Sequence, residues 1–296
     1  MPIRPIRRAL VACLAAFAAV FALSFAVVFA VQAPASAAPS SGFNDYDCHP
    51  SAAHPRPVVL LHGLGGNGPG NFLTLGPTLA GAGYCVFAET YGSPLPPVPV
   101  GGLVSIDKSA QEISALISKV LDKTGAAKVD LVGHSEGGFQ SLYIPKFVPG
   151  QAAKIQRVVA LAPPTHGTTF ADLVTLAQKL GIMDQVNKIM ATFGCQACTE
   201  LTTGAPTVAK LNSGPIAQPG IDYTVIASTS DVLVTPKGTS FVNEPGVVNA
   251  NVQDQCPSDP VGHIGLAYDG AVATMVGNAL DPGHTKPITC GIGLPF

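Results

Sequence analysis

A serine set between two glycines, where a strand gives way to a helix, constrains this chain most. The segment KVDLVGHSEGG, residues 128–138, starts with residues that suit a strand, and an apolar run follows from Phe139. In such a Gly-x-Ser-x-Gly turn the serine is exposed at the carboxyl end of the strand. Glycines are needed because side chains there would collide where strand and helix approach closely. We therefore expect Ser135 to be a nucleophile at the edge of a sheet.

The apolar pattern of the remaining chain predicts an α/β fold with a mainly parallel sheet flanked by helices. Short apolar runs alternate with helical stretches, as βαβ units require. Ser109-Ala110-Gln111-Glu112 has the spacing of a capping box, which predicts that a helix starts there. The expected strands are 58–61, 84–88, 129–132, 157–161, 223–227 and 247–252.

Residues 168–218 are expected to form a small helical insertion between two strands. Apolar residues in 168–195 recur at helical spacing and predict two amphipathic helices. If their apolar face meets lipid or lines an acyl cleft, the insertion is a lid. If the helices pack permanently on the core, it is a fixed cap.

The N-terminal residues 1–37 have the pattern of a secretory signal peptide. Arg4, Arg7 and Arg8 precede an apolar run over 9–31, and Ala35-Ser36-Ala37 supplies a cleavage site. We therefore expect cleavage near Ala37, a secreted protein, and one domain over 38–296. The apolar run is long enough that an uncleaved membrane anchor is the alternative.

Charge and cysteine content narrow the class of the exported chain. Removing residues 1–37 leaves thirteen basic and eighteen acidic residues, a net charge of about −5 with no basic stripe. Nucleic acid is therefore not an expected partner. The even number of remaining cysteines predicts disulfides, but spacing alone does not fix their pairing. The pair Cys195 and Cys198 lacks a second half-site, so zinc is not expected.

A serine nucleophile needs a histidine base, which should follow it in the chain. Two histidines lie far enough downstream, His263 and His284. His263 lies in DPVGHIGL, shortly after the last expected strand, where the base belongs. His284 lies in a Pro-rich tail, so we favour His263.

An orienting carboxylate should lie between the serine and the histidine in the chain. Asp231 follows the expected strand 223–227 and is our choice. Asp222 precedes that strand and would lie at the wrong edge of the sheet, whereas Asp254 and Asp259 follow the next strand and are the competitors.

The developing oxyanion needs two N–H donors. We expect one from the amide of Glu136, directly after the nucleophile, and the other from the amide of Leu64 in HGLGG. His62 and His134 are expected to brace these turns and not to take part in chemistry.

Together these segments resemble secreted bacterial triacylglycerol lipases of the α/β-hydrolase superfamily. The matching segments, from about residue 48 to the end, are VVLLHGLGG, VDLVGHSEGG, VVALAPPTHGT, ASTSDVLVTP and DPVGHIGL. The resemblance implies the α/β-hydrolase fold, a triad of Ser135, Asp231 and His263, and Leu64 and Glu136 as oxyanion donors. It also implies the disulfides Cys48–Cys85, Cys195–Cys198 and Cys256–Cys290.

By the same resemblance, the substrates are carboxyl esters of medium- and long-chain acylglycerols at an oil–water interface. No cofactor, metal or obligate protein partner is implied. One departure is Glu136, where many lipases have glutamine or methionine, and we expect its side chain to point away from the oxyanion. The alternatives are a cutinase-like polyester hydrolase or general carboxylesterase with the same triad, an acyltransferase, and an inactive binding module.

Overall fold

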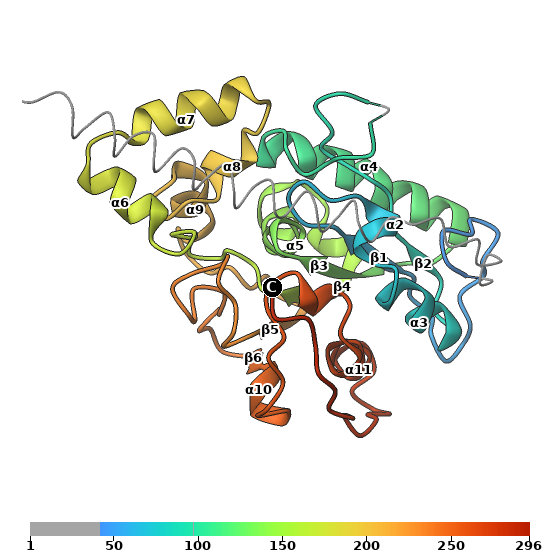
Figure 1. Ribbon diagram of the computed structural model, residues 1–296. Coiled ribbons are helices and arrows are strands. Elements are labelled where there is room, and N and C mark those ends of the chain that lie inside the picture. Colours follow the sequence, from blue (N-terminus) through green and yellow to red (C-terminus); the bar gives the residue numbers. More distant parts are fainter. Residues whose placement is uncertain (1–41, 97) are drawn as a thin grey trace, which may run out of the picture.

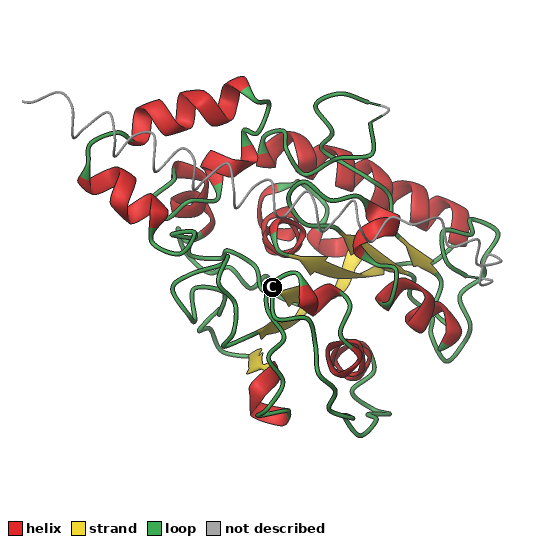
Figure 2. Cartoon of the chain, in the orientation of Figure 1, coloured by secondary structure: helices red, strands yellow, loops and turns green. Residues whose placement is uncertain are grey.

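A six-stranded parallel sheet forms the centre of the molecule in the computed structural model, which describes residues 42–96 and 98–296 (Figure 1, Figure 2). The expected signal segment, residues 1–37, lies outside the described residues. The strand order is β2-β1-β3-β4-β5-β6, and every neighbouring pair is parallel. The strands are β1 Val58–Leu61, β2 Val86–Phe87, β3 Val129–His134, β4 Ile155–Leu161, β5 Asp222–Ala227 and β6 Val247–Asn251. The predicted α/β class with a parallel sheet is confirmed.

Helices cover both faces of this sheet, and alternate strand residues pack on each side. Residues Val59 and Leu61 of β1 face α4 (Ile106–Thr124) and α5 (Glu136–Phe147). Val58 and Leu60 face α3 (Leu75–Gly81) and α11 (Gly270–Leu280) on the opposite side (Figure 1). Because all four of these strand residues have no exposed surface, β1 reads in the sequence as an unbroken apolar run.

The start of α4 corrects one sequence prediction. The helix begins at Ile106, and the Ser105 side chain caps it by accepting the amide of Lys108 at 3.3 Å. Ser109 is already one turn inside the helix and fully buried, and Glu112 accepts the amide of Gly92 at 2.7 Å. The capping-box prediction at Ser109 was wrong because a tertiary contact, and not a cap, uses Glu112.

The chain between β4 and β5 holds four helices, of which α6 and α7 stand away from the sheet (Figure 1). Their bounds are α6 Leu173–Lys179, α7 Met183–Thr192, α8 Ala197–Glu200 and α9 Pro206–Leu211. α6 and α7 pack on each other through Ala177, Ile182 and Val186. Over the described ranges, no helix combines the length and apolar character needed to cross a bilayer.

Three disulfides join distant or adjacent segments, and they are the pairs that the resemblance implies: Cys48–Cys85, Cys195–Cys198 and Cys256–Cys290. The first ties the N-terminal arm to the chain entering β2, and the second lies inside the helical insertion. The third anchors the C-terminal tail beside α10 (Val252–Gln255). The remaining short helices are α2 Gly68–Asn71 and the 3-10 turns Ala152–Lys154 and Gly265–Ala267.

The C-terminal tail packs closely on the loop 259–265. The amide of Gly262 donates to the Leu294 carbonyl at 2.8 Å, and that of Gly265 to the Phe296 carbonyl at 2.7 Å. A Cβ added to Gly265 would lie 2.2 Å from the Leu294 oxygen. The tail and the loop therefore fix each other.

We predict that deleting residues 291–296 speeds hydrogen exchange at the amides of Gly262 and Gly265, because both lose their acceptors. Exchange at Ile113 and Ile117 in α4, which pack in a different core cluster from Val261, is the control. Unchanged protection at the two glycines would contradict this account of the tail.

Candidate active site

The turn between β3 and α5 holds Ser135 in a conformation that few residues adopt. Its φ is 58° and its ψ is −118°, outside the regions that side chains favour. A Cβ on Gly133 would lie 2.1 Å from the Gly137 oxygen, and one on Gly137 would lie 2.1 Å from the Leu61 oxygen. Both positions therefore require glycine, because the helix backbone is pressed against two strands.

Ser135, His263 and Asp231 form one hydrogen-bonded row. His263 Nε2 lies 2.8 Å from Ser135 Oγ, and His263 Nδ1 lies 2.7 Å from Asp231 Oδ2. Asp231 Oδ1 accepts the amides of Leu233 and Val234 at 2.8 and 2.9 Å, which fixes the carboxylate in the turn after β5. Burial acts to raise the pKa of Asp231, but His263 and the two amides together lower it. The carboxylate is thus held ionised beside the imidazole.

The competing candidates lie elsewhere. His284 is exposed and pairs with Asp281 at 3.1 Å. Asp222 begins β5 and pairs with Arg157, at the end of the strand opposite Ser135. The other two acids accept backbone amides: Asp254 that of Asn251, and Asp259 those of Val261 and Gly293.

Two backbone amides beside Ser135 are free to donate. In the loop after β1, the amides of Gly63, Gly65 and Gly66 are each bonded, to Asn71 Oδ1, the Gly101 oxygen and the Gly63 oxygen. Within the part of the chain that the structure describes, the amides of Leu64 and Glu136 donate to no acceptor. The Glu136 amide also lies at the N-terminus of α5, where the helix dipole favours negative charge.

Two buried histidines brace the loops around the serine. His62 Nδ1 lies 2.9 Å from the Gly63 oxygen, and its Nε2 accepts the Tyr91 amide at 3.2 Å. His134 Nε2 lies 2.9 Å from the carbonyl oxygen of His263. Burial lowers the pKa of His62 to about 4 and that of His134 to about 3, so both are neutral at pH 7.

Two further residues at the site carry no signal in the local sequence pattern. Asn71 Oδ1 holds the Gly63 amide at 3.0 Å, and the Tyr91 hydroxyl lies 2.6 Å from the His62 oxygen and 2.5 Å from Glu136 Oε2. The Glu136 carboxyl is thus directed into the protein and away from the serine. Asn71 holds its own loop and also lies 3.2 Å from His134 Nδ1, whereas Tyr91 joins distant segments. Sequence reasoning missed both residues.

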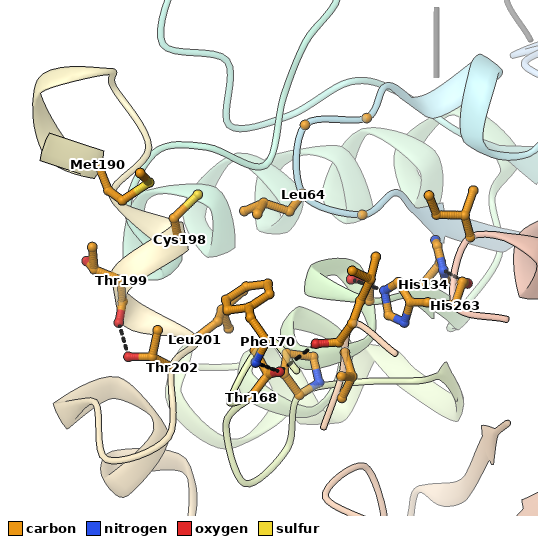
Figure 3. Close-up of a pocket in the computed structure, with 18 of the residues that line it drawn as sticks. Leu64, His134, Thr168, Phe170, Met190, Cys198, Thr199, Leu201, Thr202 and His263 are labelled. Carbon is orange, nitrogen blue, oxygen red and sulfur yellow. Dashed lines mark hydrogen bonds between the residues drawn. The ribbon is translucent and has the colours of Figure 1, made fainter. Parts of the chain in front are cut away.

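An apolar pocket opens above Ser135 and His263 (Figure 3). In that view Met190, Cys198 and Leu201 from the helical insertion face His134 and His263 across the pocket, and Leu64 lies between them. The other apolar residues that line the pocket are Phe170, Met183, Val186, Leu233, Val234 and Ile264.

Among residues 42–96 and 98–296, no cluster of three or more His, Cys, Asp or Glu side chains could hold a metal ion.

Solved structures of α/β-hydrolase lipases have a similar arrangement of strands and helices. Lipase B of Aspergillus fumigatus superposes with a TM-score of 0.59 at 17% identity, over 81% of this chain and 57% of that chain. The mature lipase BlEst2 of Bacillus licheniformis gives a TM-score of 0.52 at 18% identity, over 70% of this chain and 87% of that chain. The protein therefore has the α/β-hydrolase fold.

The family follows from the sequence comparison. The model of the class 2 lipases matches residues 55–272, so the chain belongs to the class 2 lipase family. Triacylglycerol lipases of Pseudarthrobacter phenanthrenivorans and Burkholderia plantarii are each 30% identical to it over 145 residues, 48% of this chain. The match covers 43% and 38% of those two lipases, so the chain spans less than half of their length.

We predict that Gly133→Ala destabilises the fold by about 1–3 kcal/mol or more, because the new Cβ meets backbone atoms that cannot move aside. Gly277→Ala is the matched control: Gly277 lies within α11, and a Cβ there meets nothing within 4 Å. This second change should stabilise by about 0.5–1 kcal/mol. Urea unfolding measures both, and equal effects would contradict the close packing at the turn.

We also predict an acid-sensitive stability contribution from the buried histidines. The pKa of His62 is depressed when folded, so the stability that it contributes is present above about pH 6.5 and is lost as the pH falls through about 4. Within that window, His62→Gln should reduce the slope of unfolding free energy against pH by about 1.4 kcal/mol per pH unit. Urea unfolding at several pH values measures the slope, and an unchanged slope would show that His62 titrates normally.

Proposed function

We propose that this protein is a secreted serine lipase that hydrolyses carboxyl esters of medium- and long-chain acylglycerols. One observation carries the proposal: Ser135, His263 and Asp231 form a continuous hydrogen-bonded row at the base of an apolar pocket. Membership of the class 2 lipases and the relatives named as triacylglycerol lipases support the same activity. The three disulfides suit an oxidising compartment, which supports export.

The proposed mechanism follows from the row. His263 Nε2 takes the proton of Ser135 while Oγ attacks the ester carbonyl, and Asp231 holds the imidazole in the required tautomer. The free amides of Leu64 and Glu136 stabilise the oxyanion. His263 then returns the proton to the departing alcohol, leaving an acyl-enzyme. Water, activated in the same way, releases the fatty acid.

The pocket supports an aliphatic acyl chain as the group bound next to Ser135. Its walls are predominantly apolar, and Phe170, Val186 and Met190 of the helical insertion lie along it. On binding, an acyl chain would move out of water into contact with these side chains. Each buried CH₂ would contribute about 0.8 kcal/mol to the binding free energy. A polymer chain would suit a cleft without these added walls better, so a pocket walled by the helical insertion favours a lipase over a cutinase-like polyester hydrolase.

We predict that Ser135→Ala lowers kcat for ester hydrolysis by about 10⁴-fold or more, because the nucleophile is lost, and that Asp231→Asn lowers it by about 10⁴-fold. His284→Gln and Asp254→Asn change residues of the same types outside the row and should retain wild-type rates. A 4-nitrophenyl ester series and emulsified long-chain triglyceride are the substrates. Substantial activity in Ser135→Ala would refute the proposed nucleophile, and a preference for polyester film over triglyceride would refute the proposed substrate.

A further inference from the structure

The carboxyl group of Glu136 lies in a buried hydrogen-bond chain behind the nucleophile. The residue has no exposed surface. Its Oε1 accepts from Gln140 Nε2 at 2.8 Å, and its Oε2 lies 2.5 Å from the Tyr91 hydroxyl oxygen. That hydroxyl lies in turn 2.6 Å from the carbonyl oxygen of His62. This chain of hydrogen bonds therefore links α5 to the loop that carries Leu64.

Counting hydrogens along this chain places a proton on Glu136. A tyrosine hydroxyl has one hydrogen, and the His62 carbonyl can only accept. If Tyr91 donates to His62, the short contact between Tyr91 and Glu136 needs a second hydrogen, which only a protonated carboxyl supplies. An ionised Glu136 would take the Tyr91 hydrogen and leave the Tyr91 and His62 oxygens 2.6 Å apart without one.

Turning over the Gln140 side-chain amide would not change this count of hydrogens. Its Nε2 donates to the Ile106 carbonyl at 3.1 Å as well as to Glu136 Oε1 at 2.8 Å. The carbonyl can only accept, so the amide cannot turn over without losing this bond.

The charges around the carboxyl do not favour its ionised form. Glu200 on α8 adds a like charge, and Glu112 on α4 bonds to the Gly92 amide. His62, whose carbonyl bonds to Tyr91, and His134, which precedes Ser135, are both neutral and add no positive charge. The ammonium of Lys210 on α9 bonds to Asp107 of α4 and to Tyr143 of α5. Burial raises the pKa of Glu136 to about 8, although its bonds to Tyr91 and Gln140 act to lower it.

We propose that Glu136 is protonated at neutral pH and, by donating to Tyr91, acts as a positioning residue that ties together the two amides of the oxyanion site. The second part rests on the proposed function. Glu136 itself carries one amide, and His62 precedes the Gly63-Leu64 segment that carries the other. Loss of the proton would place a negative charge beside the Glu136 amide and withdraw the Tyr91 hydrogen from His62. Ester hydrolysis should therefore fail as the pH rises.

A titration of the glutamates tests the protonation state without any substrate. The chain has five glutamates, Glu89, Glu112, Glu136, Glu200 and Glu244, so ¹³Cδ-glutamate labelling gives a simple carboxyl spectrum. We expect one signal to titrate near pH 8 and to be missing from Glu136→Gln. If that variant does not fold, Glu200→Gln must retain the signal, since Glu200 is the other glutamate, half-buried, whose pKa burial raises. A spectrum in which every glutamate titrates in the acid range would overturn the proposal.

The pH dependence of hydrolysis tests the positioning role. In the wild type, kcat/KM should fall about tenfold between pH 7 and pH 9, as the protonated fraction of Glu136 does. Glutamine mimics the protonated carboxyl, because its NH₂ donates to Tyr91 and its oxygen accepts from Gln140. With each profile scaled to its own value at pH 7, Glu136→Gln should lose this alkaline fall and Glu200→Gln should keep it.

The two experiments separate the two proposals. The same alkaline fall in Glu136→Gln as in the wild type would overturn the positioning role, whatever the titration shows. If neither the wild type nor the two variants hydrolyse esters, the proposed function fails and the positioning role fails with it. The spectrum of the labelled protein still decides whether Glu136 is protonated.

Discussion

A close backbone contact between α5 and the strands β1 and β3 is the constraint on which the site depends. Gly137 lies against the Leu61 carbonyl, and Gly133 lies against Gly137. The start of the helix is therefore so close to the sheet that no Cβ fits between them. In this turn Ser135 is held at a positive φ of 58°. The same turn leaves the amide of Glu136 without an acceptor. One packing contact thus exposes a hydroxyl and frees a donor next to it.

The other parts of the site are held by one local turn and by contacts between distant segments. The C-terminal tail fixes the loop of His263, the turn after β5 fixes Asp231, and Tyr91 joins the loop of Leu64 to Glu136. Burial keeps His62 and His134 neutral, so neither places a positive charge beside Ser135. In the proposed reaction, oriented amides therefore stabilise the oxyanion.

Much of this arrangement could be predicted from the sequence because the relevant signals are local. A strand buried on both faces is an apolar run, and a strand–turn–helix with two glycines marks the nucleophile position. The chain order of serine, acid and base then selected Asp231 and His263, which the structure places in one row. The start of α4 was missed although its Ser105 cap is local, because Ser109 and Glu112 have the same capping-box spacing. The role of Tyr91 and the contact of the tail with Gly262 could not be predicted, because they depend on segments that meet only after folding.

Covalent labelling tests the central claim, that His263 activates Ser135, most directly. A fluorophosphonate reacts with a serine whose oxygen is activated by a neighbouring base, and the labelled peptide is identified by mass spectrometry. The account predicts rapid labelling of Ser135 in the wild type and very slow labelling in a folded His263→Ala variant. Labelling at a different serine, or equal rates in the two proteins, would contradict it.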